Sequence, residues 1–482
     1  MNLKSIVLKG FSLFTIAKII SGISQLITIT ILARILLPND FGIVGAATTI
    51  INFVTILGSF GLEPAVIRKR NNFIKYLNVA ASLRLFIGII LTLIAILIAP
   101  YSQLIFDNPN VPSVVRVLSI SFIIVSAGFV ANVTLLKNFQ YKKLFIPNVI
   151  GSITTSFFSI LLAYLGFSYW SIVFSFLIGN FTSLIILYIL YPWKLQIVYD
   201  KKILKYLIKY GSTNFMWVIT VYIFFNIDIY SIGYLLGTTK LGYYVLALTW
   251  ATIISTQFGG IIHSVQLPVY SKIQNNNAQM ENVYLKTFRI IYWFIIPINI
   301  LLIIIAPDFL KYFLGHDTDK WAQSILPLQI LCVCGIFRII IDPMSNIFLI
   351  KNKIKTLTEI NLIPLIIYLI IIYPCIIYFN GIIGVAISLT ISCLILLILY
   401  IFLIQRILNI ASHKLSSIFF QIIILTTIYF SILKISQMFF IHSFYGVIYF
   451  ILFSLGIYII LIIIISKGMV ITELKGILIS LK

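Results

Sequence analysis

Long apolar stretches separated by short polar turns make up most of the chain. A helix that spans a bilayer needs about 20 mostly apolar residues, and breaks at Pro, Gly, Asn or charged clusters leave fourteen such stretches. The apolar runs are continuous and do not alternate with polar residues, which excludes a transmembrane β-barrel. The pattern predicts an all-α integral membrane protein with about fourteen transmembrane helices. Their approximate bounds are 11–37, 41–67, 76–99, 113–136, 145–165, 169–191, 206–236, 241–270, 284–306, 323–350, 357–379, 382–404, 416–440 and 444–466.

The composition also favours a membrane protein. Apolar residues make up 61% of the chain, charged residues 10%, and the mean hydropathy is +1.12, whereas a soluble domain carries about 25% charged residues. A soluble enzyme, a disordered chain and a nucleic-acid-binding domain are therefore excluded. The four cysteines and four histidines show no metal-ligand spacing, so neither a metal site nor a bound cofactor is expected.

Basic residues, which give the chain a net charge of +22, fall almost entirely in alternate connections between the predicted spans. One set of connections, with the two termini, holds 25 Lys and Arg residues, and the other set holds 3. Connections rich in Lys and Arg stay in the cytoplasm, so both termini are predicted to be cytoplasmic. The basic excess thus indicates topology and contact with membrane lipids rather than binding of nucleic acid.

Three pairs of short motifs recur in the same order, six predicted spans apart. The clearest is Asn-x-x-Leu-[Leu/Ile]-Lys-Asn, at residues 132–138 and again at 346–352. Because six is even, two copies of a six-helix unit would face the same way, related by a pseudo-twofold axis along the membrane normal. The other pairs are residues 36–42 with 235–242 and residues 64–69 with 268–272.

This repeat predicts how the chain divides. A first six-helix lobe covers residues 1–193, a basic cytoplasmic linker covers 194–205, and a second six-helix lobe covers 206–405. Two additional transmembrane helices and a cytoplasmic tail occupy 406–482. In transporters built from such repeats, the substrate binds near the bilayer midplane between the lobes.

Basic residues inside the predicted spans are candidates for binding the substrate, because a charge at the centre of a spanning helix costs about 2.5–3.5 kcal/mol. Lys18, Arg84 and Arg338 lie deepest. We expect them to bind an anion such as a diphosphate in a hydrated cavity. The other basic residues of the spans lie nearer the outer ends, where snorkelling to the interface is an equal alternative. They are Arg34, Arg116 and Lys434.

Acidic residues inside the spans are candidates for coupling transport to an ion gradient. Asp228 has no basic residue within one helical turn. It would take up a proton or bind a cation, unless it accepts a structural hydrogen bond from Asn226 or from a neighbouring helix. Glu63 and Asp342 are the other candidates. Glu63 would otherwise lie at the membrane interface, and Asp342 would pair with Arg338 on one helix face.

The sequence contains few motifs that would indicate an enzyme. The connections are too short for an ATPase domain, and no Gly-Lys dipeptide of a phosphate-binding loop occurs. Asp317-Thr318-Asp319 could hold the metal of a glycosyltransferase, but it lies in a short outer loop. His263 is interpreted as a hydrogen-bonded interior histidine. We therefore expect a transporter rather than an enzyme, driven by an ion gradient, by substrate supply and removal, or by both.

Motifs in the first two spans resemble a known family. They are Leu-Ala-Arg at 32–34, Pro-x-Asp-Phe-Gly at 38–42 and Gly-Leu-x-x-Ala-x-Ile at 61–67. Together they resemble the opening of Wzx-type polysaccharide transporters, or lipid-linked oligosaccharide flippases, of the multidrug/oligosaccharidyl-lipid/polysaccharide exporter superfamily. The fourteen predicted spans, the short loops and the repeat extend the resemblance over the whole chain. Arg34 and Asp40 match the motifs.

This resemblance implies a function. Such transporters flip oligosaccharide repeat units linked to undecaprenyl diphosphate across the bacterial inner membrane, for O-antigen of lipopolysaccharide, capsule or exopolysaccharide. A lipid-linked oligosaccharide is then the substrate, and polysaccharide polymerase machinery is the implied partner. Two alternatives share the superfamily: a flippase for the peptidoglycan precursor, which also has fourteen spans, and a multidrug cation antiporter, which usually has twelve. A membrane glycosyltransferase or polymerase would need a large outer loop.

Overall fold

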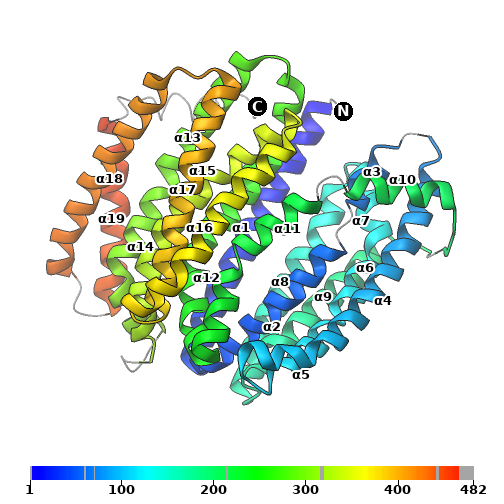
Figure 1. Cartoon of the computed structure of the whole chain (residues 1–482), viewed down its shortest axis with the longest axis horizontal. Coiled ribbons are helices and arrows are strands. Elements are labelled where there is room, and N and C mark those ends of the chain that lie inside the picture. Colours follow the sequence, from blue (N-terminus) through cyan, green and yellow to red (C-terminus); the bar gives the residue numbers. More distant parts are fainter. Residues whose placement is uncertain are drawn as a thin grey trace. The chain divides into compact units, whose positions relative to one another are not determined.

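The computed structural model describes residues 3–58, 61–69, 71–194, 196–212, 215–314, 320–440 and 444–465. Helices joined by short turns account for these residues, and no strand occurs among them (Figure 1). The chain divides into two compact units, residues 1–245 (unit one) and 246–482 (unit two). The prediction of an all-α membrane protein is confirmed.

Unit one contains the helices from the N-terminus to the first part of α12. They are α1 (Leu3–Ile35), α2 (Pro38–Leu57), α3 (Leu62–Ile67), α4 (Phe73–Phe106), α5 (Val111–Leu118), α6 (Ser121–Ala127), α7 (Phe129–Lys137), α8 (Tyr141–Tyr164), α9 (Trp170–Leu190), α10 (Lys201–Ser212), α11 (Phe215–Phe224) and the start of α12 (Ile227–Ile273).

Unit two contains the rest of α12 and the helices that follow it. They are α13 (Asn277–Phe294), α14 (Ile296–Phe309), the short π-helix η1 (Leu310–Leu314), the 3-10 turn η2 (Ala322–Ser324), α15 (Ile325–Ile350), α16 (Ile354–Tyr378), α17 (Ile382–Leu408), α18 (Ser412–Phe440) and α19 (Phe444–Ile465).

The number of possible spans agrees with the sequence pattern. Among the described residues, 11 helical segments are long and apolar enough to cross a membrane, and two bent helix pairs raise the number to 13. A straight α12 of 47 residues would be about 70 Å long, more than twice the hydrocarbon thickness of a bilayer. Gly237, with φ 81° and ψ 171°, breaks it. With this break, each of the fourteen predicted stretches has a helical counterpart.

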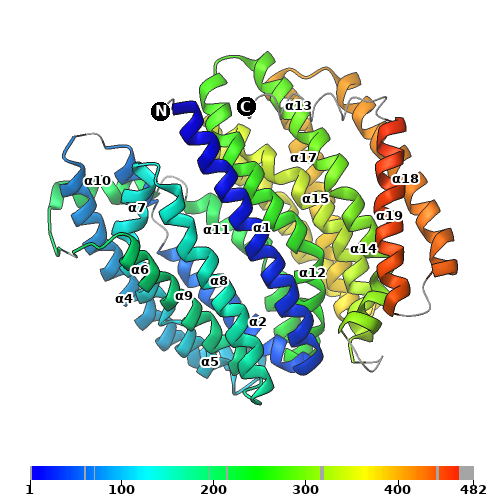
Figure 2. The ribbon, with the colours of Figure 1, turned by 180° about the vertical axis from the view of Figure 1, so that it is seen from behind.

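Small and hydroxylated residues bring the helices of unit one together. The hydroxyls of Ser21 and Ser24 on α1 lie 3.0 and 2.7 Å from those of Ser152 and Ser156 on α8. On the next interface, a Cβ atom on Gly179 of α9 would approach the backbone of α8 to 2.7 Å. Without a hydrophobic driving force in lipid, such close backbone contacts and interhelical hydrogen bonds hold helices together. Figure 2 shows α1, α8 and α9 side by side.

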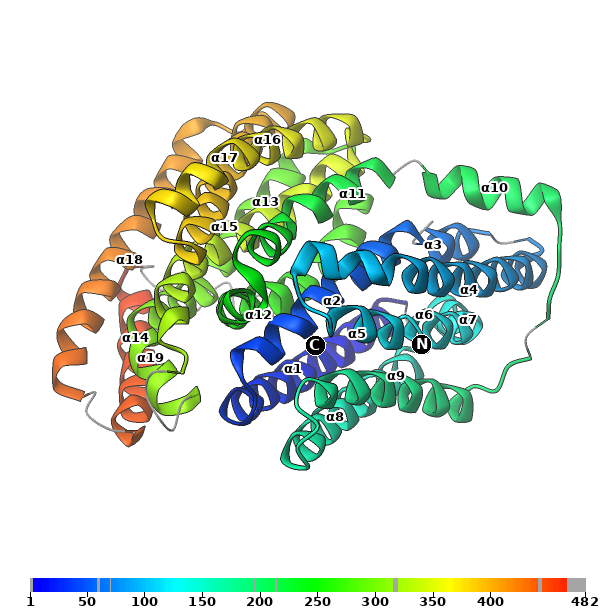
Figure 3. The same ribbon diagram turned by 60° about the horizontal axis from the view of Figure 1, so that its bottom comes forward.

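At one end of unit one, α10 lies beside α3 and α4 (Figure 3). Its buried residues Ile203 and Leu207 join an apolar cluster with α3 and α4. The segment before α10 is tied to α4 by Lys75 and Asp200, whose charged atoms lie 2.7 Å apart. The hydrogen bond from Lys75 holds the pKa of Asp200 below its usual value. The basic segment after α9 is therefore anchored to its own unit.

In unit two, the last two helices pack against α13 and α14. Tyr292 of α13 donates to the Gln421 carbonyl of α18 at 2.8 Å, and Tyr458 of α19 donates to the Trp293 carbonyl at 2.5 Å. The cysteines lie inside the same unit: Cys332, Cys334 and Cys393 are buried, and Cys375 is half-buried. Helices α18 and α19 thus pack within unit two.

Candidate transport site

The two turns related by the repeat, residues 36–42 and 235–242, pack directly against each other in unit one. A Cβ atom on Gly42 would lie 1.8 Å from the Thr238 carbonyl oxygen, and one on Gly242 would lie 1.7 Å from that of Pro38. The contact is reciprocal, because each glycine stands four residues after the carbonyl that the other glycine meets. Only glycine allows such a close approach, so these turns mark where the two copies of the motif meet.

Polar side chains fix this contact. The Thr238 hydroxyl donates to Asn39 Oδ1 at 2.7 Å and accepts from Asn108 Nδ2 at 2.9 Å. Asn108, which follows α4, in turn accepts from the Asn110 N–H at 2.9 Å. Three segments that are distant in sequence are therefore held at one point.

Asp40, one of the residues of the family motif, has a structural role. Its carboxylate accepts from the Leu37 N–H at 2.8 Å and from the Ser168 hydroxyl at 2.5 Å. It therefore caps the start of α2 and ties it to the turn between α8 and α9. Arg34, the other motif residue, is exposed.

Repeat-related lysines make equivalent bonds at the predicted cytoplasmic ends of the two copies. Lys137 Nζ donates to the Lys69 carbonyl at 2.5 Å in unit one. Lys351 Nζ donates to the Gln274 carbonyl at 2.7 Å and to Asn277 Oδ1 at 2.8 Å in unit two. In both copies the lysine at the end of the fourth span satisfies a carbonyl just after the second span. The structure thus gives the motif Lys a shared role.

Arg84 and Glu63, two of the predicted site residues, lie near each other in unit one. Arg84 Nη1 donates to the Gly58 carbonyl at 2.9 Å, at the end of α2. Its guanidinium also interacts electrostatically with Glu63 of α3. Arg84 is half-buried and Glu63 exposed. Arg84 therefore interacts with Gly58 and Glu63, which both lie far from it in the sequence.

Asp228 is completely buried near the start of α12. Its Oδ2 accepts a hydrogen bond from the Tyr244 hydroxyl at 2.7 Å, and it interacts electrostatically with Tyr222. Asn226 Nδ2 donates to the Tyr222 carbonyl at 2.9 Å. The carboxylate therefore sits in a tyrosine-rich environment of unit one.

Arg338 and Asp342 lie on one face of α15, as the spacing of four residues predicts. The two charges interact electrostatically. Arg338 is half-buried and Asp342 exposed, near the middle of a helix that can span a membrane. A Cβ atom on Gly259 of α12 would lie 3.0 Å from Asp342 Oδ2. An exposed carboxylate at this depth requires water or a polar ligand.

The other candidate residues are distributed over both units. Lys18 is half-buried on α1, and Arg116 and Lys434 are exposed. Lys18 and Arg84 belong to unit one and Arg338 to unit two, so their common contact with one anion remains a prediction. Asp317 and Asp319 lie outside the described residues, and the side chain of His263 lies outside the described side chains.

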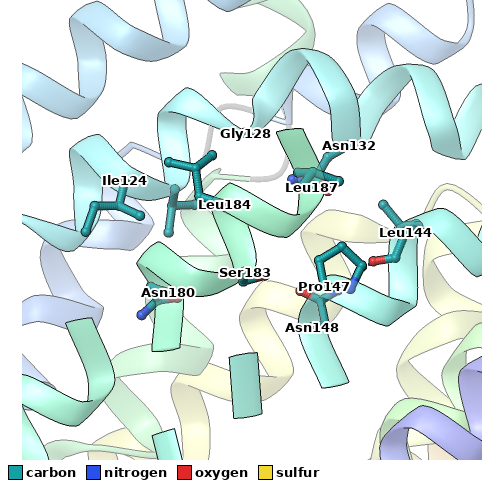
Figure 4. Close-up of a pocket in the computed structure, with 11 residues that line it drawn as sticks. Ile124, Gly128, Asn132, Leu144, Pro147, Asn148, Asn180, Ser183, Leu184 and Leu187 are labelled. Carbon is teal, nitrogen blue, oxygen red and sulfur yellow. Dashed lines mark hydrogen bonds between the residues drawn. The ribbon is translucent and has the colours of Figure 1, made fainter. Parts of the chain in front are cut away.

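A polar pocket in unit one was not predicted. It has a volume of about 120 Å³ and lies between α6, α7, α8 and α9 (Figure 4). It is lined by Ile124, Val125, Gly128, Asn132, Leu144, Pro147, Asn148, Asn180, Ser183, Leu184 and Leu187. The sequence signal was three asparagines inside predicted spans, but only the fold brings them together.

Comparison with known proteins shows the family to which the chain belongs. Residues 31–326 match the family described as "Polysaccharide biosynthesis protein". The chain belongs to this family. The match covers more than half of the chain, including the packed turns at 36–42 and 235–242, the polar pocket, and the candidate residues Glu63, Arg84 and Asp228.

Individual members extend the similarity over the whole chain. The chain is 26% identical to "Uncharacterized membrane protein in cps region" of Klebsiella pneumoniae, with 97% of this chain and 96% of that protein covered. It is 22% identical to "Lipopolysaccharide biosynthesis protein WzxC" of Escherichia coli (strain K12), with 75% and 73% covered. The predicted resemblance to Wzx-type transporters is therefore confirmed.

A solved structure shows the same fold. "Lipid II flippase MurJ, inward closed conformation" matches with a TM-score of 0.77 and 17% identity, over 95% of this chain and 99% of that one. At this identity the likeness concerns the fold alone. The chain is thus a multi-pass membrane protein with the two-lobe, all-α transporter fold.

Proposed function

We propose that the chain flips oligosaccharide repeat units linked to undecaprenyl diphosphate across the bacterial inner membrane, with both termini in the cytoplasm. The observation that carries this proposal is the family match over residues 31–326. The chain acts as a transporter and not as an enzyme, and its product passes to a polysaccharide polymerase for O-antigen, capsule or exopolysaccharide.

Charges in the spanning helices support an anionic substrate. Arg338 is half-buried and Asp342 exposed on α15, a helix that can span a membrane, and Lys18 and Arg84 are half-buried in spanning helices of unit one. We assign the diphosphate to Lys18, Arg84 and Arg338, because a guanidinium binds phosphate oxygens in a bidentate manner. Asp228, Glu63 and Asp342 are the candidates for binding the coupling ion.

Deletion of the gene tests the proposal in cells. Lipid-linked repeat units should accumulate on the inner leaflet, and the surface polymer should disappear. Plasmid-borne wild-type chain should restore it. Normal surface polysaccharide in a deletion strain without a second flippase would contradict the proposal. A block in peptidoglycan synthesis instead would favour the peptidoglycan-precursor flippase, and sensitivity to organic cations alone would favour the multidrug antiporter.

A further inference from the structure

The polar pocket of unit one lies at a break in the fourth span. The segment Val111–Ala127, which contains α5 and α6, meets α7 at Gly128 and is bent by 43° relative to it. Gly128 itself lines the pocket, and a Cβ atom there would lie 3.3 Å from Leu187 and 3.4 Å from Asn132 Nδ2. A side chain at this position would narrow the space, so the bend and the glycine together keep the pocket open.

Uncharged amide and hydroxyl groups converge on this space. Asn132 on α7, Asn148 on α8, and Asn180 and Ser183 on α9 line it (Figure 4). No charged side chain belongs to the lining. The pocket therefore does not suit a diphosphate, which calls for cationic groups.

These polar groups retain unused hydrogen-bonding capacity. Asn148 Nδ2 donates to the Leu144 carbonyl at 3.2 Å, and Asn180 Nδ2 donates to the Phe176 carbonyl at 2.9 Å. A primary amide has a second N–H and an oxygen with two lone pairs. Within the described part of the chain, the side chains of Asn132 and Ser183 make no hydrogen bond. Polar groups inside a membrane span are costly unless they have partners, so a ligand or water must supply them.

In the second copy of the repeat, the asparagine equivalent to Asn132 has a different environment. Asn346, the counterpart of Asn132, is completely buried in unit two, and its Nδ2 donates to Gln266 Oε1 at 3.3 Å. An asparagine at this point of the repeat can therefore bond within the protein. In the first copy it faces a pocket instead, which indicates a role other than packing.

We propose that this pocket binds hydroxyl groups of the uncharged sugars of the lipid-linked oligosaccharide, an inference that rests on the proposed function. Amides donate and accept hydrogen bonds as sugar hydroxyls do, and the pocket volume of about 120 Å³ is enough for several hydroxyl groups. Asn132 lies five residues before Lys137, at the predicted cytoplasmic end of its span. The pocket is then on the side where the substrate enters.

Binding of two lipids separates this sugar subsite from the diphosphate site. The full chain in nanodiscs is titrated with undecaprenyl diphosphate and with the lipid-linked glycan extracted from the deletion strain. The wild-type chain should bind the glycan-bearing lipid more tightly. The variant Asn132→Leu with Asn180→Leu removes two amides and should weaken that binding about tenfold, since each hydrogen bond contributes roughly 0.5–1.5 kcal/mol. Binding of undecaprenyl diphosphate should not change.

Thr182→Val is the matched control, because Thr182 lies on α9 but bonds only its own helix, to the Ile178 carbonyl at 2.8 Å. It should leave both affinities unchanged. Equal weakening for the two lipids, or no change for either, would overturn the sugar subsite while the transport function stands. If the deletion strain accumulates no lipid-linked glycan, the proposed function itself fails, and the subsite fails with it.

Discussion

Asp228 is completely buried, and its carboxylate accepts a hydrogen bond from the Tyr244 hydroxyl at 2.7 Å. Asp228→Asn keeps an oxygen that accepts this bond but removes the charge. If Asp228 couples transport to an ion gradient, the variant should fold normally, and its transport in proteoliposomes should no longer respond to a pH or Na⁺ gradient.

Tyr244→Phe is the control for this experiment, because it removes the hydrogen bond but keeps the carboxylate. It should retain the response to the gradient, even if its stability falls by about 1 kcal/mol. An unchanged gradient response in Asp228→Asn would show that Asp228 is structural, and Glu63 or Asp342 would be tested next.

Arg338 tests the predicted diphosphate site in unit two, whereas Arg84 also donates a hydrogen bond to the Gly58 carbonyl. Arg338→Ala should weaken binding of undecaprenyl diphosphate roughly tenfold or more, since a hydrogen bond to a charged group contributes about 1.5–3 kcal/mol. Arg338→Lys should retain part of the affinity, because the charge stays but the bidentate fork is lost. Arg116→Ala, at an exposed position, should have no effect; equal affinities for Arg338→Ala and wild type would exclude Arg338 from the site.

For individual residues, the sequence predicted only contacts between residues that are close together in the chain. The Arg338–Asp342 interaction follows from helical spacing. The proximity of Arg84 and Glu63 does not, because they lie on different helices. Asp40 was matched as a motif residue, and its hydrogen bond with Ser168, 128 residues away in sequence, was visible only in the folded chain.

Among the helices, the contact between the two repeat-related turns makes the sharpest prediction. Gly42→Ala would place a methyl group 1.8 Å from the Thr238 carbonyl oxygen. Backbone atoms cannot move aside cheaply, so the variant should lose at least about 1–3 kcal/mol of stability. A lower Tm of the purified protein in detergent would show this, and a similar loss is expected for Gly242→Ala.

Gly456→Ala on α19 is the matched control, since no atom lies within 4 Å of the added methyl group. It should keep or slightly raise the Tm, because alanine favours a helix more than glycine does. A Gly42→Ala protein as stable as wild type would mean that the turns do not pack as described.

Most elements were predictable because each apolar stretch is long enough to span a membrane on its own. The sequence also predicted a turn between the spans 206–236 and 241–270. Gly237, which lies in that turn, breaks α12. The bend at Gly128 was not, because a single glycine inside an apolar run gives no distinct signal. The polar pocket was missed because only the fold brings its three asparagines together.

For the whole molecule, the distribution of basic residues predicts the topology. Reporter fusions after Lys75, Lys143, Lys209 and Lys355 should all report the cytoplasm, because connections rich in Lys and Arg are retained there. A fusion within residues 307–321, of which 315–319 lie outside the described residues, should report the outer side. A cytoplasmic signal at that position would refute the scheme.

The repeat was predictable from three short motifs, and the equivalent bonds of Lys137 and Lys351 give it a physical basis. The boundaries proposed for the two lobes, with a linker at 194–205, remain a prediction. Sequence motifs locate equivalent positions in two copies, but they do not fix where one compact unit ends.

Transport by the purified chain tests the central claim most directly. The chain is reconstituted into proteoliposomes that carry the lipid-linked glycan from the deletion strain, and a membrane-impermeant reagent that modifies the glycan measures how much becomes exposed on the far leaflet. We expect exposure to rise well above that of protein-free liposomes, and to fall when Lys18, Arg84 and Arg338 are all replaced by Ala. Exposure equal to that of protein-free liposomes, with correctly folded protein present, would contradict the proposal that this chain is a flippase for lipid-linked oligosaccharides.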